Sequence, residues 1–114
     1  MNDDSRVVCH TPTPGKKPTR IHKWKYDLLR GIILDILDSS ADGVEFRSLP
    51  SFIDACLNPG QRANLGSVGW YTTTVKLDME VQGDIERIPN ASPQRLRLVD
   101  RSRQPGANAE SRSP

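Results

Sequence analysis

The stretch GSVGWYTTTVKLDMEVQG, from Gly66 to Gly83, limits the fold of this chain more than any other stretch. Ser67 suits the N-cap of a helix, and Gly83 suits the left-handed residue that ends one. Between them, apolar side chains follow helical spacing in two adjacent stripes, which predict a helix with most of its circumference in the core. The stripes consist of Val68, Tyr71, Val75 and Met79, and of Trp70, Thr74, Leu77 and Val81.

Two further helices are predicted ahead of this one. Leu and Ile recur at helical intervals over residues 22–38, and the sequence SSADG then ends the helix. Residues 49–57 form a shorter helix with Ser48 at its N-cap. Asn58-Pro59-Gly60 breaks that helix, so we expect residues 60–66 to be a polar loop. The side chains expected to point inward from the shorter helix are Phe52, Ile53, Cys56 and Leu57.

Short strands surround these helices. Val44-Glu45-Phe46 alternates apolar and polar residues and predicts an edge strand. After Gly83, DIERIP and QRLRLV predict two strands joined by a turn at residues 90–93. Helix, short strand, helix, loop, longer helix and β-hairpin is the element order of a winged helix. We therefore expect a mostly helical α+β fold, a winged helix-turn-helix with three helices, one short strand and a C-terminal β-hairpin wing.

The large apolar residues divide the chain into three parts. Residues 1–20 predict a flexible, basic, Pro-rich arm, residues 21–99 the winged-helix domain, and residues 100–114 a disordered tail. Cys9 is expected to be an exposed thiol of the arm and Cys56 a small core residue, so no disulfide is predicted. No signal peptide and no apolar run of membrane-spanning length is present, which favours a cytoplasmic protein.

Two stretches of the chain resemble a family of small, uncharacterised bacterial proteins with a winged-helix-like domain: TPTPGKKPTRIHKWKYD and GSVGWYTTTVKLDMEVQGDIERIPNASPQRLRL. Members show a similar Pro-Gly-Lys arm, a similar Gly-Ser-Val-Gly-Trp-Tyr helix start and a similar Ser-Pro-Gln-Arg hairpin. The resemblance covers roughly residues 11–99. It implies the same fold and a bacterial, cytoplasmic setting, and the family offers no established activity to transfer.

The sequence offers little for catalysis. His10 and His22 have no partners at the spacing of a metal site or a nucleophile-activating pair. Asp78 and Glu80 lie on different faces of the predicted helix and do not form a carboxylate pair. We therefore expect no enzyme activity, no catalytic residue, no metal, no cofactor and no small-molecule substrate.

The arrangement of charge favours a polyanionic partner. Basic residues gather in residues 16–30 and again in residues 87–103, on either side of an acidic middle. In a winged helix the third helix can enter the major groove, while the wing and a basic arm contact phosphates. The candidate DNA-binding residues are Ser67, Gly69, Thr72, Thr73 and Lys76 of the third helix, Arg87, Arg95 and Arg97 of the wing, and Lys16, Lys17 and Arg20 of the arm.

The element order and the charge arrangement are compatible with two functions. The first is a small, regulatory winged-helix protein that binds double-stranded DNA through its third helix, its wing and its basic arm, with Arg95 and Arg97 expected to contribute more than Thr72 and Thr73. The second is a winged-helix module that binds another protein and no DNA. Basic charge in arm and wing favours the first, while a third helix with Lys76 as its one outward cation and Glu80 on the same strip favours the second.

Overall fold

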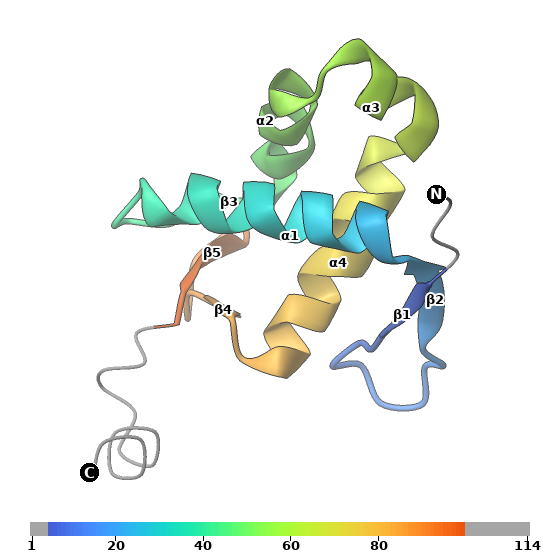
Figure 1. Cartoon of the computed structure of the whole chain (residues 1–114). Coiled ribbons are helices and arrows are strands. Elements are labelled where there is room, and N and C mark those ends of the chain that lie inside the picture. Colours follow the sequence, from blue (N-terminus) through green and yellow to red (C-terminus); the bar gives the residue numbers. More distant parts are fainter. Residues whose placement is uncertain (1–4, 100–114) are drawn as a thin grey trace, which may run out of the picture.

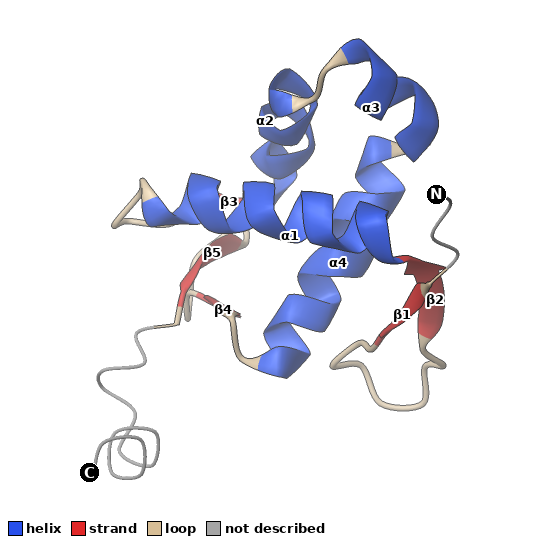
Figure 2. Cartoon of the chain, viewed as in Figure 1, coloured by secondary structure: helices blue, strands red, loops and turns tan. Residues whose placement is uncertain are grey.

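A computed structural model describes residues 5–99, which fold into four α-helices and two small antiparallel sheets (Figures 1 and 2). The mostly helical α+β fold predicted from the sequence is confirmed. None of the helices in this part of the chain is long and apolar enough to cross a membrane. In chain order the elements are β1 (Arg6–Cys9), β2 (Thr19–His22), α1 (Lys23–Asp38), β3 (Val44–Glu45), a 3-10 turn (Phe46–Ser48), α2 (Leu49–Cys56), α3 (Pro59–Leu65), α4 (Val68–Gln82), β4 (Ile85–Arg87) and β5 (Arg95–Leu98).

Helices α1 and α4 cross at the centre of the fold (Figure 1). The predicted i, i+4 spacing of α1 is confirmed, because Leu29, Ile33 and Leu37 are all buried. Helices α2 and α3 lie on one side of this pair, and the two small sheets lie near opposite ends of α1 (Figure 2). The core therefore collects one buried stripe from each helix. Its residues from the other elements include Leu49, Ile53, Leu65, Val75, Met79, Ile85 and Leu96.

Both predicted ends of α4 are confirmed. The hydroxyl of Ser67 accepts a hydrogen bond from the Trp70 amide at 3.1 Å. Gly83 adopts the left-handed conformation with φ of +84°, and the Asp84 amide donates back to the Met79 carbonyl at 2.9 Å. The chain then turns directly into β4.

The three-stranded sheet has the order β3-β5-β4, so the short strand after α1 pairs with the second strand of the C-terminal hairpin. Both predictions, the edge strand and the hairpin, are confirmed. Gly43 precedes β3 with φ of +87°, and a Cβ there would lie 2.8 Å from the Leu96 carbonyl oxygen. Glycine is needed at this position for both reasons.

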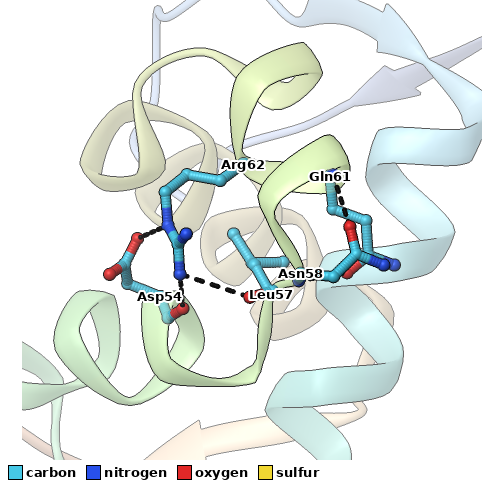
Figure 3. A network of polar contacts seen from close by, with 5 residues as sticks. All are labelled: Asp54, Leu57, Asn58, Gln61 and Arg62. Carbon is cyan, nitrogen blue, oxygen red and sulfur yellow. Dashed lines mark hydrogen bonds and ion pairs between the residues drawn. The ribbon is translucent and has the colours of Figure 1, made fainter.

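The predicted loop at residues 60–66 is wrong, because Pro59–Leu65 forms helix α3. Asn58 and Gln61 make a reciprocal capping box in which each side chain accepts a hydrogen bond from the backbone amide of the other residue (Figure 3). Arg62 then donates to the carbonyl oxygens of Asp54 and Leu57 at the end of α2. These bonds satisfy carbonyls that the helix end leaves free and fix α3 against α2.

The predicted arm is also corrected. Strands β1 and β2 pair as a hairpin from Arg6↔His22 to Cys9↔Thr19, with Cys9 and Ile21 buried. The carboxylate of Asp78 on α4 fixes this hairpin. Its Oδ1 accepts from the His10 backbone amide at 2.9 Å, and its Oδ2 accepts from the Tyr26 hydroxyl of α1 at 2.6 Å. The predicted tail, residues 100–114, lies outside the described residues.

Both cysteine assignments are wrong. Cys9 is buried under the hairpin, and burial raises the pKa of its thiol to about 11, with the negative charge of Asp78 adding to the effect. Cys56 is exposed, and so is Phe52 at 48%, whereas Ile53 and Leu57 are buried as predicted and Leu49 joins them in the core. Helix α2 is therefore rotated relative to our prediction.

Asp78→Ala is expected to lower the free energy of unfolding by about 2 to 4 kcal/mol, because the Tyr26 hydroxyl and the His10 amide lose their acceptor. Urea unfolding measures the change. The matched control is Asp27→Ala, since the ion pair of Asp27 with Lys23 is exposed and its loss should change stability by less than about 0.5 kcal/mol. Equal effects of the two substitutions would contradict the role assigned to Asp78.

The two thiols should react at very different rates with a disulfide reagent at mildly alkaline pH. Cys56 is exposed and should react at once, whereas Cys9 is buried with a raised pKa and should react only after denaturation. Thiol titration with and without denaturant measures this. Cys56→Ser should abolish the fast phase, and a fast phase that survives this substitution would place Cys9 at the surface.

Candidate functional site

Helix α4 presents a different face to solvent from the one predicted. Thr72 and Lys76 were expected to face outward, but they are 0% and 2% exposed. Trp70 was expected in the core, but it is 48% exposed. Neither Thr72 nor Lys76 can contact DNA from these positions, and both are removed from the candidate site. The solvent side of α4 consists of Trp70, Thr73, Thr74, Leu77 and Val81, each exposed or half-buried.

Lys76 is a structural residue. Its Nζ lies 2.5 Å from Glu80 Oε2 and 4.5 Å from the centre of the Phe46 ring. Burial lowers the pKa of Lys76, and the neighbouring Glu80 carboxylate works in the opposite direction. Glu80 Oε1 also accepts from Arg87 Nε at 2.9 Å. This network joins α4 to the 3-10 turn and to β4, and it leaves Lys76 no surface for a ligand.

The three wing arginines are paired with carboxylates. Arg95 and Arg97 share a face of β5, as predicted, but Glu45 and Glu86 stand opposite them on the neighbouring strands. Arg97 lies 2.6 Å from Glu86, while Arg95 lies 3.6 Å from Glu45 and donates to the Gly43 carbonyl at 2.9 Å. Arg87 is bound to Glu80. Each positive charge of the wing is thus offset by an adjacent negative one.

The hairpin cations have a different environment. Lys16, Lys17 and Arg20 are exposed and make no ion pair with any of residues 5–99. Residues 5–22 contain no Asp or Glu at all. Two of the three cations, Lys16 and Lys17, lie in the loop between β1 and β2, and Arg20 lies on the outward side of β2. The hairpin is therefore a compact positive surface.

A groove of about 320 Å³ separates this hairpin loop from the solvent side of α4. Its α4 wall carries the indole of Trp70, and its loop wall carries the two lysines. The charged residues of α4 do not face it, because Lys76 and Asp78 are buried and Glu80 is nearly so. The groove therefore combines aromatic, hydroxyl and cationic groups. Its lining residues are Cys9, His10, Thr11, Thr13, Lys16, Lys17, Thr19, Trp70, Thr74 and Leu77.

The remaining candidates lie near the start of α4. Ser67 is at the surface, but its hydroxyl is occupied by the cap. Gly69 is exposed, and a Cβ built on it meets no atom within 4 Å, so nothing in the described residues requires glycine there. Thr73 is exposed on the same side of α4. The structure thus brings Lys16 and Lys17 to a groove shared with Trp70 and Thr74 of α4, and it places Arg87, Arg95 and Arg97 in or beside a separate sheet.

The fold and this groove define a small, mostly helical α+β domain with a basic hairpin set against one face of α4. The chain belongs to a family of unknown function (DUF6958), whose model matches residues 6–96. This match includes the β1–β2 hairpin, which is part of the folded unit. Comparisons with curated proteins and with solved structures gave no match.

Sequence reasoning missed the hairpin and with it the groove. The signal was present, because RVVC and TRIH are two short strand-like segments on either side of a loop rich in proline and glycine. The carboxylates that occupy the wing arginines were also visible, as Glu45 and Glu86 in the neighbouring predicted strands. Only the pairing register shows that they stand opposite Arg95 and Arg97.

Lys76→Ala should lower the free energy of unfolding by about 3 kcal/mol, because it breaks a buried ion pair and opens a cavity against Phe46. The matched control is Thr73→Ala on the solvent side of the same helix, which should change stability by less than about 0.5 kcal/mol. Urea unfolding compares them. A larger loss for the Thr73 variant would contradict the observed rotation of α4.

Proposed function

We propose that this protein is a small regulatory winged-helix protein that binds double-stranded DNA through its β1–β2 hairpin and the solvent side of α4. The proposal rests on one observation: Lys16 and Lys17 lie beside a helix face with no exposed charge, and neither they nor Arg20 on the same hairpin form an ion pair with any of residues 5–99. A bacterial, cytoplasmic setting and the absence of a catalytic role belong to the same proposal.

The topology supports a winged helix. A hairpin follows α4 and adds to the strand after α1, which gives the order β3-β5-β4. Helices α3 and α4 are separated by Gly66 and Ser67, a glycine-containing turn of the kind found between the two helices of a helix-turn-helix. In this interpretation α4 is the recognition helix. Helix α3 then precedes it directly in the motif.

The electrostatics favour the hairpin over the wing. Binding to DNA gains free energy when protein cations replace counterions along the phosphates. Lys16 and Lys17 can do so without breaking an ion pair to any of residues 5–99. Arg95 and Arg97 would first have to leave Glu45 and Glu86, whose carboxylates also repel phosphate. On the helix, the hydroxyls of Thr73 and Thr74 are the groups suited to bond base edges in the major groove.

A second candidate function is the binding of another protein, and one observation favours it. An apolar groove of about 440 Å³ lies beside α2, where Phe52 and Cys56 are exposed on its rim. This groove is lined by Ile36 and Val44 as well, and it carries no charged side chain. It is separate from the hairpin surface, so the two functions are tested by different residues.

Lys16→Ala with Lys17→Ala should weaken binding to a fluorescent duplex of random sequence and flatten the log–log salt dependence by about two units, one for each lost phosphate contact. Fluorescence anisotropy at several salt concentrations measures both. Arg95→Ala with Arg97→Ala is the matched control, since it removes the same charge from the paired arginines and should change the slope much less. Each variant is first checked for an unchanged melting temperature.

The anisotropy results distinguish DNA binding by the hairpin from DNA binding by the wing, and both from the binding of another protein. A flattened slope in the wing variant alone would move the contact surface to Arg95 and Arg97. No binding to duplex DNA by the unaltered protein at low salt would end the DNA proposal and leave the protein partner.

A further inference from the structure

The groove between the hairpin loop and α4 has an aromatic wall that is held in place. Trp70 meets the ring of Tyr71 edge to face, with centroids 4.8 Å apart and planes at 84°. Tyr71 is fixed in turn, because Lys25 Nζ donates to its hydroxyl at 3.1 Å and lies 4.6 Å from its ring. The indole of Trp70 is therefore supported from one side while nearly half of its surface stays in water.

The opposite wall is cationic and polar. A turn fixes the loop, with the Lys16 amide donating to the Thr13 carbonyl at 3.4 Å and Gly15 at φ of +81°. The Thr13 amide also donates to the Thr11 hydroxyl at 3.2 Å. Lys16 and Lys17 follow this turn and line the groove, and no carboxylate lines it. The groove volume, about 320 Å³, is at the lower end of the range for pockets that hold small ligands.

This pair of walls matches the two halves of a nucleotide. A base stacks on an aromatic face whatever its sequence, and a phosphate is attracted by lysine ammonium groups. Inside a duplex, both faces of each base are already covered by its neighbours. A base can therefore lie against Trp70 only if it is unpaired or has left the stack.

We propose that this groove binds one unpaired nucleotide, with its base against Trp70 and its phosphate at Lys16 and Lys17. The protein should then prefer DNA that contains a single-stranded stretch over an intact duplex. This inference rests on the proposed function, because it concerns the same hairpin surface, and it names the form of DNA that the surface recognises. Thr74 and Leu77 form the rest of the α4 wall beneath the base.

Trp24 provides a matched control for Trp70. It is 39% exposed and has an ammonium group, that of Lys25, 5.6 Å from its ring, but it lines a different groove with Gln61 and Asn64 of α3. The test compares three fluorescent ligands by anisotropy: an intact duplex, the same duplex with a short single-stranded gap, and an oligo-dT strand. We expect the gapped duplex to bind on the order of tenfold more tightly than the intact one, which is the stacking contribution of a single base.

Trp70→Ala should remove this preference, so that the variant binds the gapped and the intact duplex with similar affinity, while Trp24→Ala should keep the preference. A second readout uses the fact that the chain has two tryptophans. In Trp24→Phe the remaining fluorescence comes from Trp70 and should be quenched by oligo-dT. In Trp70→Phe the fluorescence of Trp24 should not respond.

The result distinguishes this inference from the proposed function. Equal affinity for gapped and intact duplex, with no effect of Trp70→Ala and no quenching, would overturn the nucleotide site and leave duplex binding in place. No binding to any of the three DNAs would overturn both. A preference for the gap that survives Trp70→Ala but is lost in Trp24→Ala would overturn the assignment to this groove.

Discussion

The carboxylate of Asp78 is the contact on which the rest of this structure depends. It lies on α4 and accepts hydrogen bonds from the Tyr26 hydroxyl of α1 and from the His10 amide at the end of β1. Three elements far apart in the sequence therefore meet at one side chain. A charged group is buried only where such donors meet it, since its desolvation is otherwise too costly. The Asp78 interaction thus fixes both the rotation of α4 and the position of the hairpin beside it.

The same principle explains why the pattern of apolar residues gave the wrong rotation for α4. Thr72, Lys76 and Asp78 have polar side chains, and such side chains normally lie on the solvent-facing side of a helix. Here both charged side chains have partners inside the fold. Lys76 forms an ion pair with Glu80 and lies over the Phe46 ring, and the carboxylate of Asp78 accepts a hydrogen bond from the Tyr26 hydroxyl. Trp70 is left outside as a consequence. Periodicity could not reveal this, because the Phe46 ring and the Tyr26 hydroxyl belong to other elements.

The local elements were easier to predict than the site. Helices α1, α2 and α4, strand β3 and the C-terminal hairpin follow from caps, turns and spacing within short stretches, such as Ser67 and Gly83 around α4. Helix α3 was missed although Asn58 and Gln61 form a capping box that is readable in the sequence. The site could not be predicted from such local signals, because its groove exists only when the hairpin packs against α4.

Where this protein can bind an anion depends on which of its cations already form ion pairs within residues 5–99. In the wing, the sheet register sets Glu45 and Glu86 opposite Arg95 and Arg97, so those charges are already satisfied. In the hairpin, no acid is present between residues 5 and 22 to do the same. Pro12, Pro14 and Pro18 restrict the backbone around Lys16 and Lys17, so less conformational entropy is lost when the loop meets a ligand. The stiff loop carries two lysines that form no ion pair within residues 5–99, and it shares a groove with the Trp70 indole, which packs edge to face on Tyr71. This groove is therefore already arranged for a ligand that carries both a flat ring and a negative charge.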